Sequence, residues 1–193
     1  MDLAISRWIV QTFGESKVFA EIAKIFSFIG SKWIIIGLLI LLLFFKRTRK
    51  LGVYSIIAIA IAFAINDFIL KIIIARDRPF IADPSLSQIA NLVGYKLDDG
   101  YSMPSGHSVV SMAFAIMCII HSRKIGIPAV IVAVLVGISR ICLCVHYLTD
   151  VLAGFAFGVA VAVAVHFSLN AIIKAWKKRQ WKKKGGVTEN PQQ

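Results

Sequence analysis

Residues 52–74 read GVYSIIAIAIAFAINDFILKIII, and residues 75–79 continue as ARDRP. The first run is apolar and long enough to cross the ~30 Å hydrocarbon core of a bilayer as one helix. Its two charged side chains, Asp67 and Lys71, are four residues apart and therefore share a helix face, where they can pair. We expect the helix to end near Ala75, to present Lys71 inward, and to be followed by Arg78 returning from the loop. The alternative for Lys71 alone is that it snorkels to the membrane interface.

The composition supports a membrane protein of one domain. The chain has 193 residues, of which 58% are hydrophobic and 17% charged, and its mean hydropathy is +0.78. Soluble domains contain about 45–50% apolar and about 25% charged residues. We therefore predict an all-α transmembrane bundle over residues 1–184, followed by a disordered polar tail at 185–193.

Five further runs have the length or helical periodicity of spans: Lys17–Ile29, 33–45, 109–120, 125–145 and 151–173. The total of six spans would place both termini on the same side of the membrane. Lys17–Ile29 is the weakest of them because it carries Glu21 and Lys24. An interfacial amphipathic helix is the alternative to a span whose polar stripe faces the bundle.

The basic residues predict the orientation. They gather at 46–50, at 123–124 and in a lysine-rich cluster at 174–184, within a net charge of +12. The positive-inside rule makes these segments and both termini cytoplasmic, and the other ends of the spans then face the outside of the cell membrane. The basic cluster could instead bind nucleic acid, but basic residues beside Trp176 and Trp181 after a span are typical of the cytoplasmic interface. We expect membrane lipids and no nucleic acid as partners. The sequence does not indicate the oligomeric state.

Two more clusters are expected at the outer ends of the spans. PSGH at 104–107 places Ser105 at a helix N-cap, Gly106 where backbone can approach a ligand, and His107 in the first turn, where free N–H groups attract anions. In SRICLCVHYLTD at 139–150, Asp150 can orient the imidazole of His146. Taken singly, these could be a capped helix with an incidental histidine and an interfacial His–Asp pair.

The three clusters in this order resemble the signature of the type 2 phosphatidic acid phosphatase family, which shares its core with vanadium-dependent haloperoxidases. That signature reads K-x6-R-P, P-S-G-H and S-R-x5-H-x3-D, and the chain matches every position. The resemblance covers roughly residues 33–165. It implies that His146 is the nucleophile, that Asp150 orients it and that His107 protonates the leaving oxygen. The phosphoryl oxygens would be bound by Lys71, Arg78, Arg140, Ser105 and Gly106.

The function that the resemblance implies is a lipid phosphatase working through a phosphohistidine at the outer face of the membrane. Undecaprenyl pyrophosphate is the favoured substrate, and phosphatidylglycerophosphate and phosphatidic acid are alternatives. A vanadate-type haloperoxidase and a non-enzymatic membrane protein on the same fold are further alternatives. No cofactor or metal is expected, because the sequence has no HExxH motif, EF-hand loop or paired-acid cluster. The three cysteines are expected to serve packing, and His121 and His166 to be structural.

Overall fold

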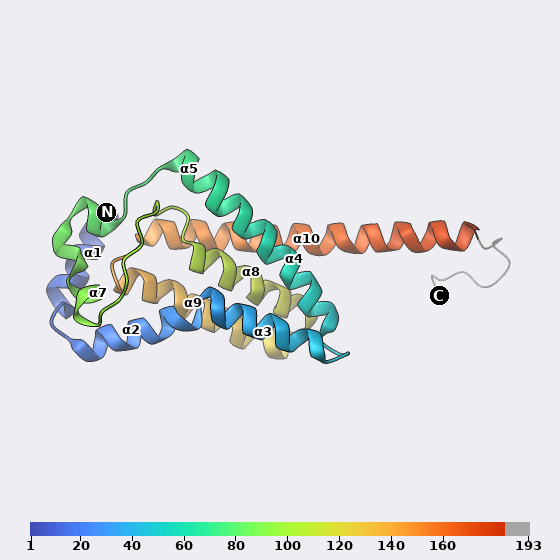
Figure 1. Cartoon of the computed structure of the whole chain (residues 1–193), viewed down its shortest axis with the longest axis horizontal. Coiled ribbons are helices and arrows are strands. Elements are labelled where there is room, and N and C mark those ends of the chain that lie inside the picture. Colours follow the sequence, from blue (N-terminus) through green and yellow to red (C-terminus); the bar gives the residue numbers. More distant parts are fainter. Residues whose placement is uncertain (184–193) are drawn as a thin grey trace.

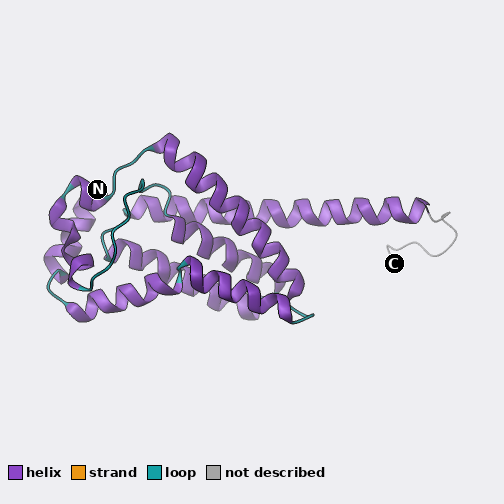
Figure 2. Ribbon diagram, viewed as in Figure 1, coloured by secondary structure: helices purple, strands orange, loops and turns teal. Residues whose placement is uncertain are grey.

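A computed structural model describes residues 1–183, which form helices and loops without a strand (Figure 2). The helices in chain order are α1 (Asp2–Phe13), α2 (Lys17–Ile29), α3 (Lys32–Phe44), α4 (Arg49–Ile65), the π-helix η1 (Asn66–Leu70), α5 (Lys71–Ile74), α6 (Pro79–Ala82), the 3₁₀-helix η2 (Pro84–Ser87), α7 (Gln88–Leu92), α8 (Gly106–His121), α9 (Arg123–Cys142) and α10 (Leu148–Lys183). The all-α prediction is confirmed. The predicted tail at 185–193 lies outside the described residues.

The six separate spans that we predicted are not all present. Helices α2 and α3 have 13 residues each, which is about 20 Å of helix and too short to cross a bilayer. They follow one another with a bend of 42° at the break between them, which is the form of a broken span or of a re-entrant pair. Three stretches are each long and apolar enough to cross a membrane: Arg49–Ala82, which begins with α4, and helices α9 and α10. Helix α8 is apolar but shorter, with 16 residues. Neither Lys17–Ile29 nor 33–45 is therefore long enough to be a span by itself.

Helix α1 and the last described turns of α10 lie at opposite ends of the bundle (Figure 1). Asp2 in the first turn of α1 contacts Thr149 at the start of α10, whereas the end of α10 projects from the far end of the molecule. The physical reason is that the connection of α2 to α3 bends the chain without reversing it. The predicted same-side placement of the termini would require an even number of spans.

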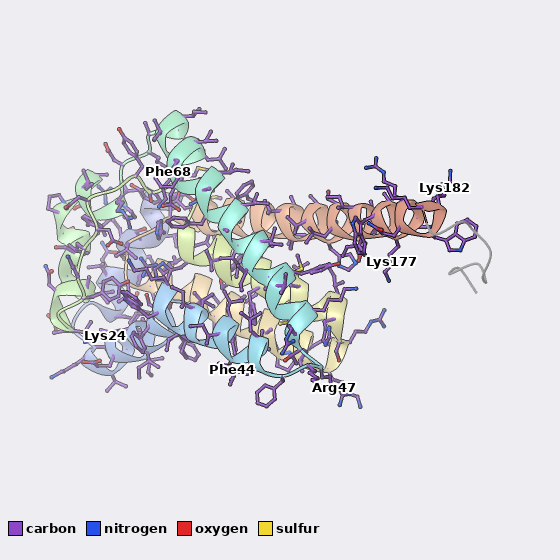
Figure 3. All side chains as sticks on the ribbon, turned by 45° about the vertical axis from the view of Figure 1, so that its right-hand side comes forward. Lys24, Phe44, Arg47, Phe68, Lys177 and Lys182 are labelled. Carbon is purple, nitrogen blue, oxygen red and sulfur yellow. The ribbon has the colours of Figure 1, made fainter. Side chains whose placement is uncertain are left out.

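The basic segments meet at the end from which α10 projects. Figure 3 shows Arg47, Lys177 and Lys182 there and Lys24 toward the opposite end. Lys50, His121 and His166 line one small hollow at the basic end, which joins α4, α8 and α10. His166 accepts a hydrogen bond from Asn170 at 2.9 Å, and Asn170 accepts one from Tyr54 at 3.0 Å.

Helices α8 and α10 pack closely because α10 carries glycine at two positions one turn apart. A Cβ added at Gly154 would lie 2.9 Å from the carbonyl oxygen of Ser105, and one added at Gly158 would lie 2.6 Å from that of Val109. Small residues at this spacing allow transmembrane helices to approach one another. The approach brings the beginning of α8 against the beginning of α10. Both candidate histidines lie near these two helix starts.

Candidate active site

Three distant segments of the chain converge on one cavity of about 460 Å³. Six of the eight predicted site residues line it: Lys71, Arg78, Gly106, His107, Arg140 and His146. The other two, Ser105 and Asp150, are fully buried and do not line the cavity. The cavity also has apolar walls at Trp33 and Phe63. It therefore combines cations and imidazoles with an apolar surface.

Lys71 reaches the cavity from a helix that changes its winding just before it. Helix α4 continues into the π-helix η1, and Lys71 follows as the first residue of α5. A π-helical turn rotates the residues that follow it, and such turns are frequent at functional sites. The Lys71 ammonium pairs with Asp67 at 2.6 Å, as the spacing predicted, and only 14% of its side chain is exposed. Lys71 thus faces the bundle and does not snorkel.

Arg78 is held by backbone carbonyls from two separate segments of the chain. Ala75 ends α5 in the left-handed conformation, with φ of 46°, which is costly for a residue with a Cβ. After this turn, Arg78 Nε donates to the carbonyl of Gly100 at 2.7 Å and Nη1 donates to that of Val145 at 3.2 Å. Its Nη2 lies 3.8 Å from the exposed carboxylate of Asp98. The guanidinium is therefore fixed next to the segment that carries His146.

The PSGH turn begins α8, as predicted. Ser105 occupies the N-cap position without a side-chain cap, and its hydroxyl accepts a hydrogen bond from Ser108 Oγ at 3.0 Å. Its backbone N–H donates to the carbonyl of Asp150 at 3.1 Å, which ties the turn to α10. A Cβ added at Gly106 would lie 3.8 Å from the Lys71 ammonium. The turn thus places the Gly106 backbone and His107 beside the cations.

Arg140 is completely buried at the C-terminal end of α9. Its Nη1 donates to the hydroxyl of Ser27 on α2 at 2.5 Å and also to the hydroxyl of Tyr95, whose ring lies beneath the guanidinium. Its Nε is buried without a hydrogen-bond partner among the described residues. A buried donor of this kind costs free energy unless it is satisfied. A ligand oxygen in the cavity could satisfy it.

His146 follows α9 in a non-helical turn, and Asp150 lies in the first turn of α10. The Asp150 Oδ2 accepts hydrogen bonds from Ser102 Oγ and from the backbone N–H of Tyr147 at 2.8 Å. His146 Nδ1 lies 3.6 Å from this Oδ2 and 3.3 Å from Ser102 Oγ. Because the only hydroxyl proton of Ser102 points to Asp150, Ser102 Oγ is left to accept from an Nδ1–H. This tautomer leaves Nε2 as the nucleophilic nitrogen.

The electrostatics keep the His146 ring neutral. Burial lowers the pKa of His146 below its ordinary value, the neighbouring guanidiniums of Arg140 and Arg78 lower it further, and Asp150 opposes them only in part. A neutral imidazole with a fixed tautomer can attack an electrophile.

Sequence reasoning missed the residues that hold this arrangement. Arg76 binds Asp150 and lies inside the K-x6-R spacing, where it could have been noticed as an additional cation. Ser102, Ser27 and Tyr95 belong to no motif, and only the folded chain brings them to the site.

In residues 1–183 no group of three or more His, Cys, Asp or Glu side chains is placed to hold a metal ion.

Comparisons with known proteins agree with this architecture. An undecaprenyl-diphosphatase from Sulfolobus acidocaldarius is 37% identical over 131 residues, which are 67% of this chain and 60% of the relative. The undecaprenyl-diphosphatase BcrC from Bacillus subtilis is 30% identical over 115 residues, which are 60% of this chain and 56% of the relative. The matches thus span less than two thirds of the length of these relatives.

A solved structure covers more of the chain. It is the crystal structure of a transmembrane PAP2 type phosphatidylglycerolphosphate phosphatase from Bacillus subtilis, with a TM-score of 0.70 and 26% identity over 89% of this chain and 85% of that one. Residues 47–174, which hold all three motifs, match the PAP2 superfamily. The chain belongs to the PAP2 superfamily.

Proposed function

We propose that the protein is an integral-membrane lipid phosphatase that transfers the phosphoryl group of its substrate to His146. The observation that carries this proposal is the single cavity in which Lys71, Arg78 and Arg140 surround the space beside His107 and His146. Phosphoryl transfer depends on in-line placement of the reacting groups and on stabilisation of charge on the equatorial oxygens. Three fixed cations and the backbone at Gly106 meet these requirements.

The chemical steps that we propose use the two histidines that line the cavity. His146 Nε2 forms a bond to phosphorus while the bond from phosphorus to the leaving oxygen breaks, and His107 gives that oxygen a proton. His107 then takes a proton from water, the water oxygen attacks the phosphohistidine, and inorganic phosphate leaves with His146 restored. Arg140 Nε is the donor that a bound phosphoryl oxygen would satisfy. No step requires a metal ion.

A lipid diphosphate is the substrate that we favour, and undecaprenyl pyrophosphate is the named candidate. Two relatives carry the name undecaprenyl-diphosphatase. A second hollow of about 390 Å³ shares Ser31 and His107 with the first, and Lys24, Lys96 and Glu21 line it. Because His107 serves the bridging oxygen, the cations beyond it are positioned for the phosphate that departs with the lipid. Phosphatidylglycerophosphate is the alternative, since a relative 38% identical over 72 residues, 32% of this chain and 36% of that one, is the phosphatidylglycerophosphatase B of Bacillus subtilis.

We also propose that the cavity opens on the outer side of the cell membrane. The segments 46–50, 123–124 and 174–183 carry cations and no Asp or Glu, and they lie at the end away from the cavity. The positive-inside rule makes that end cytoplasmic. The end of α10 is then cytoplasmic, and α1 lies outside the cell.

Phosphate release in detergent tests the proposal. The purified protein is given undecaprenyl pyrophosphate, phosphatidylglycerophosphate and phosphatidic acid, each with EDTA, and His146→Ala is run in parallel. We expect release from the diphosphate to be fastest, to be abolished by His146→Ala and to be indifferent to EDTA. Release from none of the three lipids, or release that needs a metal, would contradict the proposal. Vanadate-dependent bromide oxidation by the same preparation would point to a haloperoxidase.

A further inference from the structure

Arg76 joins the N-terminal helix to the candidate catalytic carboxylate. Its Nη1 lies 2.8 Å from Asp150 Oδ1 and 2.6 Å from Thr149 Oγ1, and its Nη2 lies 2.8 Å from Asp2 Oδ2. The guanidinium also lies 4.0 Å from the ring centroid of Tyr147. Arg76 does not line the cavity, unlike Arg78 two residues later. Its charge is therefore used by protein carboxylates and not by a ligand.

The two oxygens of Asp150 have different tasks. Oδ2 faces His146 and accepts from Ser102 and from the Tyr147 N–H, whereas Oδ1 is bound by Arg76. A buried carboxylate that lost its contact at Oδ1 could rotate about its terminal torsion, which is a soft degree of freedom. Arg76 opposes this rotation, because a guanidinium binds in a fixed plane.

Arg76 also positions the second group that meets His146. The backbone N–H of Ser102 donates to the carbonyl of Arg76 at 2.8 Å. Ser102 Oγ lies 3.3 Å from His146 Nδ1. The side chain of Arg76 thus fixes Asp150, its backbone fixes Ser102, and both groups converge on the same ring nitrogen.

The first turn of α1 holds the other side of the Arg76 guanidinium. Asp2 Oδ2 accepts from Arg76 and from the hydroxyl of Thr149, the residue that precedes Asp150. The Asp2 side chain is 13% exposed and that of Arg76 is 28% exposed, so water screens this pair only partly. Asp2 therefore supplies the carboxylate that keeps Arg76 pointed along α10.

We propose that Arg76 is a positioning residue that acts on His146 through Asp150 and Ser102, and that Asp2 of α1 holds Arg76 in place. The effect on turnover rests on the proposed function, because it assumes that His146 is the nucleophile. The effect on the tautomer of His146 does not depend on turnover.

Kinetics on the full chain, with any affinity tag placed after the C-terminus, test the first effect. Arg76→Gln should lower kcat for the lipid diphosphate by about 100-fold, the size of effect that a small misplacement of a catalytic group can have. KM should change less than about threefold, because Arg76 does not line the cavity and its loss should not weaken the binding of the substrate in its ground state. Asp2→Asn should lower kcat by roughly tenfold, and the double variant should be no slower than Arg76→Gln, since both act through one chain of contacts.

The matched control is Arg7→Gln. Like Asp2, Arg7 lies on α1, and it pairs with the aspartate Asp83 at 2.9 Å. Its side chain is 54% exposed, and this pair does not include Asp150 or Ser102. This variant should leave kcat and KM unchanged. Arg76→Lys keeps the charge and can make some of the contacts, so its kcat should lie between wild type and Arg76→Gln.

Nitrogen-15 NMR of histidine-labelled protein tests the second effect, with His146→Gln used for assignment. We expect the Nδ1-protonated tautomer of His146 in wild type and Arg7→Gln, and a mixture of tautomers in Arg76→Gln. Thermal unfolding in detergent identifies variants that fail to fold, and Arg76→Lys and Asp2→Asn then carry the test. An unchanged tautomer, or a rise in KM at constant kcat, would overturn the proposal. Inactive wild type would reject the proposed function alone, because the tautomer would still report on Arg76.

Discussion

Gly154 on α10 links the packing of the bundle to the geometry of the active site, and Gly154→Ala perturbs both. The added Cβ would lie 2.9 Å from the carbonyl oxygen of Ser105 and 2.9 Å from Ser108 Cβ. Ordinary contacts begin at 3.4 Å, so the beginning of α8 must move by about 0.5 Å. Backbone that is hydrogen-bonded to Asp150 cannot rotate aside as a flexible side chain would. His107 follows Ser105 closely and must move with it.

The size of the effect can be estimated for stability and for turnover. Overpacking costs about 1–3 kcal/mol, and the better helix propensity of alanine returns up to about 1 kcal/mol. The net loss of stability is therefore between about zero and 2 kcal/mol. A misplacement of about 1 Å can reduce turnover 100-fold, so a shift of about half that size should lower kcat roughly tenfold.

The assay pairs thermal unfolding in detergent with phosphate release, and Gly37→Ala on α3 is the control. A Cβ at Gly37 would meet no atom within 4 Å, so Gly37→Ala should preserve kcat and lose no stability. Wild-type kcat in Gly154→Ala, with unchanged unfolding, would refute the close packing of α8 on α10. Equal losses of kcat in both variants would show that the effect is not specific to the active-site end.

Three further predictions concern the cavity itself. Arg140→Lys should raise KM by about 10- to 100-fold, because an ammonium cannot keep the protein contacts of the guanidinium and also donate to the substrate. Charge-assisted hydrogen bonds contribute about 1.5–3 kcal/mol each. Substrate titration measures KM, and an unchanged KM would contradict the role of Arg140 in binding the phosphoryl group. Lys24→Gln combined with Lys96→Gln should reduce kcat/KM for the diphosphate more than for a lipid monophosphate, and equal losses on the two substrates would count against a subsite for the second phosphate. Since the pKa of His146 is lowered by burial and by nearby guanidiniums, its neutral form persists as the pH falls, so the acid limb of kcat/KM should lie below the ordinary histidine pKa of about 6.5; a limb above that value would disagree.

Part of the candidate site could be predicted from the sequence by local geometry. Lys71 and Asp67 are one helical turn apart, and they pair in the structure. Gly106 and His107 begin a helix directly after Ser105. Local rules of this kind need no knowledge of tertiary contacts. The grouping of six residues on one cavity was instead an expectation from the family resemblance.

The span count could not be obtained in the same way. Two apolar runs separated by Gly30 and Ser31 have the composition of a helical hairpin, but the chain bends by only 42° there. Whether a two-residue connection reverses or continues depends on what each helix packs against. Helix α2 provides Ser27 to Arg140 and Lys24 to the carbonyl of Val93, and these contacts keep it at the active-site end.

The buried network behind His146 was also invisible to periodicity. Ser102 lies in a loop and Asp2 near the start of the chain, and each reaches the site across a long sequence separation. Their partners are polar groups whose burial follows only from the complete fold. Such groups are expected to find partners once buried, but the sequence does not say which ones.

Trapping the covalent intermediate tests the central claim most directly. Wild-type protein and His146→Gln are mixed with a lipid diphosphate labelled with ³²P in its terminal phosphate, quenched in base within milliseconds, and digested for mass spectrometry. The account predicts an acid-labile phosphate on His146 that forms before inorganic phosphate appears and is absent from the variant. Label on a different residue, or phosphate release undiminished in His146→Gln, would contradict it.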